Sequence, residues 1–180
     1  MADSVDVKKF DGDTIWGMPA DEVDRIVSAW RRERPDLDVS PFDVLSRVTR
    51  LARRLDLARG EAFAQHDLDG WEFDVLAALR RAGTPYELSP SQLVAETLVT
   101  SGTMTNRVDR LVSRGLVERR PSRSDRRGVR VRLTDEGRDK VDAALTDLLA
   151  QERAILAILQ DPERGALAAQ LRRLIRPLEP

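Results

Sequence analysis

Apolar residues recur along most of this chain at the three- and four-residue spacing of an amphipathic helix. In the first such segment, residues 20–33, one face carries four apolar residues, Val23, Ile26, Val27 and Trp30. Caps and breakers separate the segments, because Ser-Pro and Asp start helices and Gly and Pro end them. The pattern predicts these helices: residues 20–33, 41–65, 70–81, a short helix after Ser89, residues 102–113, a long helix after Thr134 and a last helix from Asp161.

Two other segments alternate apolar and polar residues, as strands do. They are residues 116–120 and 129–133, with residues 121–127 as the turn between them, and residues 86–88 form a short extended stretch. Helix, short turn, helix and two-stranded hairpin in this order make a winged helix-turn-helix. The expected fold class is therefore mainly α with a small β-hairpin wing, a winged helix-turn-helix with long dimerisation helices.

The helices on either side of this module carry apolar stripes that one small module cannot cover. Neither the stripe of residues 41–65 nor the near-heptad stripe that begins at Val141 has an obvious partner within one chain, so we expect both to pack against a second subunit. The expected organisation is a mobile N-terminus without periodicity at residues 1–18, N-terminal dimerisation and ligand helices at 19–66, the winged helix-turn-helix at 67–134, and C-terminal dimerisation helices at 135–180.

Composition excludes several classes of protein. The 180 residues include no Cys and a single His, His66, which leaves no thiolate or disulfide and too few ligands for an ordinary zinc site. The sequence has no glycine-rich phosphate loop, metal-spaced cluster or catalytic set, so we expect neither an enzyme nor a cofactor. It also has no apolar run of 18 residues and no apolar signal core at its start, which predicts a cytoplasmic protein.

Charge is distributed unevenly along the chain. The formal net charge is −1, but residues 118–132 contain seven Arg against two acidic residues, which gives that segment +5 and the remainder −6. A local cationic segment on an acidic body fits a surface that approaches phosphates at one place. A solvated arginine-rich loop is the plainer alternative.

The predicted helix at residues 102–113 has an unusual outer face. On a helical wheel its buried face consists of four apolar residues, Met104, Val108, Leu111 and Val112. The opposite face is small and polar, whereas an ordinary solvated face is rich in Glu and Lys. A small polar face can enter the major groove of DNA. The candidate DNA-binding residues on this helix are Thr103, Thr105, Asn106 and Arg110.

The turn of the predicted hairpin supplies three further DNA-binding candidates, Arg123, Arg126 and Arg127. An Arg at such a tip either enters a narrow minor groove, where the negative potential is enhanced, or touches phosphates only. The residues alone leave both possibilities open.

Two motifs stand out around the predicted hairpin. One is GLVERR, which ends at Arg120, and the other is the Asp-x-Arg of Asp125 and Arg127 followed by a strand that ends in LTDEG at Gly137. Both resemble the MarR family of bacterial regulators. The resemblance covers nearly the whole chain from about residue 21. It implies a homodimer with two winged modules that binds a pseudo-palindromic operator, usually as a repressor released by a small ligand. It also implies that Arg127 reaches the minor groove.

The N-terminal segment resembles more narrowly the urate-responsive branch of that family, which adds a helix carrying a Trp. By motif, the branch implies four ligand-binding residues here, Trp30, Asp74, Arg107 and Arg119. Arg107 lies between the buried and outer faces of its helix, which suits an Arg that points into the protein. Some urate binders have a His where this chain has Ala52, so the expected ligand is a small anion, urate-like or another organic acid. Taken singly, Trp30 could only fill the core and Asp74 could only pair with a surface Arg.

Together these features predict a ligand-responsive DNA-binding transcriptional regulator. The competing hypothesis is a helical dimer whose winged module mediates protein–protein contacts. Such a module would be expected to expose apolar or aromatic residues where this chain has an arginine-rich hairpin and a small polar helix face.

Overall fold

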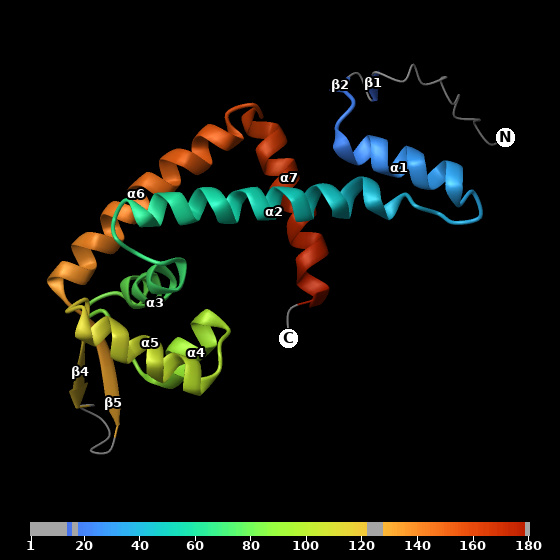
Figure 1. The fold of residues 1–180 in the computed structure, drawn as a ribbon. Helices are drawn as coiled ribbons and strands as arrows, with labels where there is room; N and C mark the ends of the chain where they lie inside the picture. Colours follow the sequence, from blue (N-terminus) through green and yellow to red (C-terminus); the bar gives the residue numbers. More distant parts are fainter. Residues whose placement is uncertain (1–13, 16–17, 122–127, 179–180) are drawn as a thin grey trace. The chain divides into compact units, whose positions relative to one another are not determined.

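The computed structural model describes residues 14–15, 18–121 and 128–178, which Figure 1 draws as ribbon. The chain divides into two compact units, residues 1–57 and 58–180. All the predicted helices are present, and a small antiparallel sheet accompanies them, so the expected fold class is confirmed. None of the helices in the described part of the chain is long and apolar enough to cross a membrane.

The first unit is built from a two-stranded ribbon and two helices. Of the segment expected to be mobile, β1 (Thr14–Ile15) pairs with β2 (Met18–Pro19), and residues 1–13 and 16–17 lie outside the described residues. Helix α1 (Glu22–Glu33) begins at Asp21, which forms a capping box with Asp24. Arg47 donates to Asp24 at 2.6 Å and so ties the start of α1 to the next helix within this unit.

Helix α2 (Pro41–Ala64) runs from the first unit into the second, whose other elements follow in chain order. They are α3 (Gly70–Arg81), β3 (Glu87–Leu88), α4 (Pro90–Thr97), α5 (Ser101–Ser113), β4 (Val117–Pro121), β5 (Val129–Leu133), α6 (Asp135–Leu156), α7 (Asp161–Ile175) and the 3₁₀ turn η1 (Arg176–Leu178). We call residues 70–133 the winged module. Figure 1 shows its helices α3, α4 and α5 gathered beside the β4–β5 hairpin.

The predicted hairpin is confirmed as β4 and β5, and the stretch predicted as extended adds a third strand, β3, to the wing. The strand order is β3-β5-β4, with Leu88 opposite Val131 and Val117 opposite Leu133. The third strand forms because β5 has a second edge whose backbone groups need partners, and the extended residues 87–88 supply them. A strand of two residues is too short to show a period of its own.

The helices and strands of the winged module pack around one apolar core. Its fully buried large side chains come from every helix of the module and from the wing, and they include Leu76, Leu79, Leu93, Met104, Leu111 and Leu116. Residues outside the module complete this core, among them Phe63 of α2, which stacks on Phe73 with ring centroids 4.2 Å apart. Val112, which the helical wheel placed on the buried face, is instead 37% exposed, because it lies at the edge of the apolar arc.

Candidate nucleic-acid interface and ligand site

Helix α5 presents the predicted DNA-binding residues of its outer face at the surface. Met104, Val108 and Leu111 hold the helix against the core, each at most 2% exposed. The four predicted residues on the other faces, Thr103, Thr105, Asn106 and Arg110, are all exposed. The space beside Gly102 is open, so the backbone at the start of α5 can approach another surface closely.

Threonines organise the first turn of α5. Helix α5 starts one residue earlier than predicted, because Thr100 rather than Ser101 is the N-cap and accepts a hydrogen bond from the Thr103 amide at 3.3 Å. The Thr105 hydroxyl donates to the Ser101 carbonyl at 3.1 Å. Each hydroxyl is thereby oriented by its own helix and keeps oxygen lone pairs for an outside donor.

Arg110 lies against the N-terminus of α3 although its side chain is 61% exposed. Its Cζ is 4.7 Å from the centroid of the Trp71 ring, and its guanidinium is 3.8 Å from the Asp69 carboxylate. The Trp71 indole N–H donates to the same carboxylate at 3.1 Å. These contacts hold the predicted DNA-binding Arg110 in one region of the surface.

The wing is cationic where the structure describes it. Arg120 lies opposite Arg130 in the hairpin, and Arg130 donates to the Gln92 side chain of α4 at 2.8 Å. The three predicted residues of the turn, Arg123, Arg126 and Arg127, lie outside the described residues. Their DNA contacts stay a prediction.

The structure brings Asp74 and Arg107, two of the four predicted ligand-binding residues, into the same electrostatic environment. Burial raises the pKa of the Asp74 carboxyl above its ordinary value, and Arg107, Arg59 and Arg81 act in the opposite direction. Arg107 is half-buried, as its place between the two faces of α5 predicted, and its Cζ lies 5.5 Å from the centroid of the Trp71 ring. A partly desolvated acid beside a cation is an arrangement that a competing anion can change.

The other two predicted ligand-binding residues have different surroundings. Arg119 of β4 forms an ion pair with Asp109 of α5 at 2.6 Å, and this pair links the wing to the outer side of the helix. Trp30 belongs to the first unit and is 46% exposed, so it does not simply fill the small core of Val23, Val27 and Val39.

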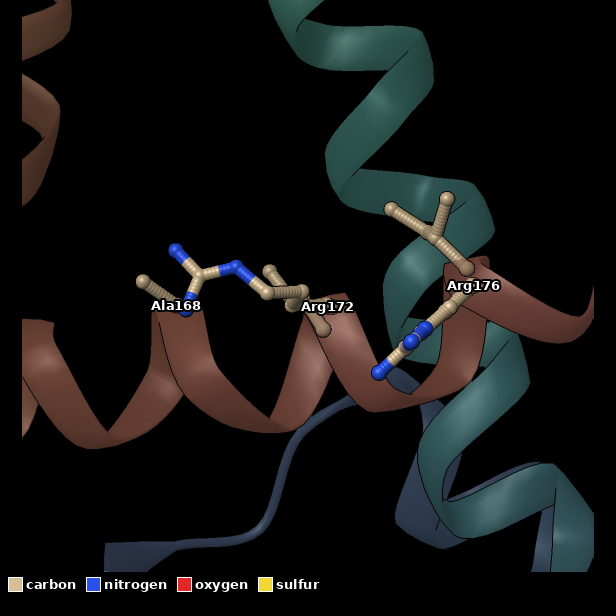
Figure 2. A pocket seen from close by; sticks show the side chains of 5 residues that line it. Ala168, Arg172 and Arg176 are labelled. Carbon is tan, nitrogen blue, oxygen red and sulfur yellow. The ribbon is translucent and has the colours of Figure 1, made fainter. Parts of the chain in front are cut away.

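Two hollows lie on other parts of the surface. One, of about 560 Å³, lies along α7 and the start of η1. Figure 2 shows Arg172 of α7 and Arg176 of η1 beside it. The other, of about 1140 Å³, lies within the first unit between α1 and the start of α2 and is lined by apolar residues such as Phe42 and Leu45. Neither hollow includes any of the four predicted ligand-binding residues.

Sequence reasoning missed two residues that organise this region. One is Trp71, whose ring receives both arginines of α5. The other is Glu72, which is 1% exposed and accepts a charge-assisted hydrogen bond from Arg114 at the end of α5. The spacing of Asp69 and Glu72 is that of a capping box, and the structure confirms it; the ion pair itself joins residues 42 apart in sequence, which no local pattern reveals.

Comparison with known proteins accounts for this arrangement. The profile of the MarR family matches residues 66–128. The chain is 41% identical over 157 residues to the transcriptional regulator PecS of Dickeya dadantii, covering 87% of this chain and 95% of that protein. It is 32% identical over 143 residues to the transcriptional repressor NicR of Pseudomonas putida, covering 77% of this chain and 89% of that protein.

The solved structures agree with the sequence comparisons. A mutant MarR of E. coli in complex with operator DNA has a TM-score of 0.63 and 28% identity, covering 77% of this chain and 99% of that one. AbsC of Streptomyces coelicolor, at 18% identity, shares the fold with a TM-score of 0.69. The exposed polar face of α5, the cationic wing and these similarities lead to one conclusion: the chain belongs to the MarR family of DNA-binding transcriptional regulators.

Proposed function

We propose that this protein is a repressor that binds a pseudo-palindromic operator as a homodimer and leaves it when a small anion binds. The observation that carries the proposal is the outer face of α5, where Thr103, Thr105, Asn106 and Arg110 are exposed on a helix held rigidly by its opposite face. In two-fold symmetric regulators of this kind, such helices enter successive major grooves about one helical turn apart. The wing residues Arg123, Arg126 and Arg127 would then lie along the flanking duplex.

Homodimer formation is supported by the apolar residues that one chain leaves exposed. Along α2, Val44, Leu45, Val48 and Leu51 are between 39% and 55% exposed. Apolar surface of this extent is unfavourable in water, and burying it gains about 25 cal/mol per Å². A second copy of the chain is the partner that a pseudo-palindromic operator requires.

The ligand half of the proposal rests on Asp74 and Arg107. An anion that binds Arg107 removes the cation that stabilises the charged form of Asp74, and Arg107 lies on the same helix as the DNA-binding residues. Arg119 would contribute through the Asp109 pair that joins β4 to α5, and Trp30 stays the fourth ligand residue expected by motif. The expected ligand is a urate-like anion or another organic acid. Because the coupling is reciprocal, DNA should weaken anion binding by the same factor as the anion weakens DNA binding.

The test is operator binding by the dimer with and without anion. We expect footprints on the protein's own promoter region, with Arg127→Ala weakening the complex by about 1–3 kcal/mol. We expect urate or another organic acid to release the DNA from the parent protein and to release it less from Arg107→Ala and Asp74→Asn. Equal affinity for any duplex, or a monomer in sedimentation at micromolar concentration, would contradict the DNA half.

Arg138→Ala is a matched control for the ligand half, because Arg138 pairs only locally with acidic residues of α6 among the described residues. It should respond to the anion as the parent does. If Arg107→Ala and Asp74→Asn also respond like the parent to an anion that releases DNA, the ligand site lies elsewhere.

A further inference from the structure

Two guanidinium groups of α5, the helix proposed to face DNA, lie over the indole ring of Trp71. The Cζ of Arg110 lies 4.7 Å and that of Arg107 lies 5.5 Å from the ring centroid. Both distances are within the range of about 6 Å in which a cation is attracted by an aromatic ring. Positions 107 and 110 are neighbours on one side of α5, which lets one ring serve both.

The ring is itself fixed from the side of α3. Its N–H donates to Asp69 at 3.1 Å, and Asp69 stands directly before α3 as its N-cap. The same carboxylate lies 3.8 Å from the Arg110 guanidinium. Asp69 thus orients the indole and attracts the arginine that the indole holds. We call Asp69, Trp71, Arg107 and Arg110 the Trp71 cluster.

The two arginines of the cluster have different roles in the proposed function. Arg110 is exposed on the DNA-binding side, whereas Arg107 is half-buried and lies in the electrostatic field of Asp74, one turn beyond Trp71 on α3. Both arginines lie over one ring, so the charge on Arg107 acts on Arg110 at short range. An anion that neutralises Arg107 changes the field at the ring and with it the balance of forces that positions Arg110.

We propose that Trp71 is a positioning residue that presents Arg110 to the operator and couples its position to the charge on Arg107. This inference rests on the proposed function, because it assigns Arg110 to DNA and Arg107 to an anion. It adds a residue outside the four predicted for the ligand and a physical route between the two sites. If Trp71 only filled space against α5, its effect on operator binding would not depend on the charge of Arg107 or Arg110.

The experiment is a pair of double-mutant cycles on operator binding, measured without any anion. Trp71→Leu keeps an apolar side chain but removes the aromatic face, and Trp71→Phe keeps a weaker one. We expect Trp71→Leu to weaken operator binding by about two- to five-fold, the effect of an exposed cation–ring contact, and Trp71→Phe by less. In an Arg110→Ala background, Trp71→Leu should have no further effect.

The second cycle replaces Arg107 with alanine. The substitution removes the positive charge that a bound anion would neutralise, so no ligand is needed. Arg107→Ala should change operator affinity by a different factor in the parent than in the Trp71→Leu background, where the two arginines no longer share a ring. The lost charge is the same in both backgrounds, so the difference reports the ring. Thermal unfolding should show each variant folded; if Trp71→Leu is not, Trp71→Phe takes its place in both cycles.

Additive effects in both cycles would overturn the inference and leave Trp71 as a packing residue. So would parental operator affinity in a folded Trp71→Leu variant. Either result is distinct from failure of the proposed function, in which the parent protein itself shows no preference for its operator.

Discussion

Apolar side chains line both helix α7 and the core of the winged module, but their surroundings differ. In the module, Leu76 and Leu79 of α3 have no exposed surface. Along α7, no described residue is buried, and Leu174 and Ile175 are each at least 50% exposed. The module completes its core within one chain, whereas α7 leaves its apolar side chains open. We therefore expect the module to fold within each chain and α7 to contribute to the proposed dimer.

This comparison predicts where a mutation acts. Changes within the module should lower the stability of each chain, because its interior is closed and cannot relax. Changes on α7 should leave the fold of the chain nearly unaffected.

The largest effect is expected from Arg114→Ala. Glu72 is 1% exposed, and its Oε1 has no hydrogen-bond partner within the described residues, so Arg114 is the cation that compensates its buried charge. The hydrogen bond to Glu72 raises the pKa of Arg114. Removing one member of a buried pair typically costs about 3–5 kcal/mol. Urea unfolding should show a loss of that size.

Arg81→Ala is the control for this change. Arg81 pairs with Glu96 at 3.2 Å, and both side chains are more than half exposed, so the expected loss is about 0–1 kcal/mol. Adding Glu72→Gln to Arg114→Ala should restore part of the stability, because the amide removes the uncompensated charge. Equal losses for the two arginine variants would show that the Glu72 site is open to water.

Ion pairs such as Arg114–Glu72 also show which features of the structure could be predicted from the sequence and which could not. Helices α3, α5 and α6 were predictable because their apolar periodicity and caps are local, and the core follows from that periodicity. The Arg114–Glu72 contact, the Arg119–Asp109 pair and the packing of two arginines on Trp71 depend on which side chains meet between elements. The third strand was missed for the same reason, since residues 87–88 become a strand only beside β5. In the candidate site, residue types could be assigned by motif, but their partners could not.

A smaller effect is expected at two glycines, one that packs against the module and one on α7. A Cβ at Gly137, in the first turn of α6, would lie 2.1 Å from the Leu116 carbonyl oxygen, whereas one at Gly165 of α7 would meet nothing within 4 Å. Gly137→Ala should therefore destabilise the chain by about 3 kcal/mol, at the upper end of the usual cost of overpacking. Gly165→Ala should stabilise it by up to about 1 kcal/mol, because alanine favours helix.

Thermal and urea unfolding of both glycine variants, at several protein concentrations, would measure the difference. A loss at Gly165 as large as that at Gly137 would contradict the comparison, because it would mean that α7 is packed as tightly as the module core.

The smallest effect concerns Asp74, whose pKa is raised in the folded protein by burial. The folded state therefore binds this proton more tightly than the unfolded state does. The stability that the carboxyl contributes is fully present below its ordinary pKa of 3.8 and is lost as the pH rises through the raised value. At neutral pH the ionised carboxylate is thus a cost to folding, which its partial exposure and the nearby arginines keep small.

Asp74→Asn should accordingly stabilise the protein at neutral pH, by less than about 1 kcal/mol once solvent screening is considered. The gain should shrink as the pH falls, because protonated Asp74 resembles Asn. Urea unfolding of both proteins across the acid range measures it, and Asp142→Asn serves as a control because Asp142 accepts hydrogen bonds from Arg80 at 2.8 and 3.1 Å and should lose stability instead. A gain that does not change with pH would show that the carboxylate charge is not its source. In the proposed ligand site we expect this same carboxylate to compete with the anion for Arg107, since only the charged form of Asp74 attracts that arginine, and the stability it costs would be the cost of that function.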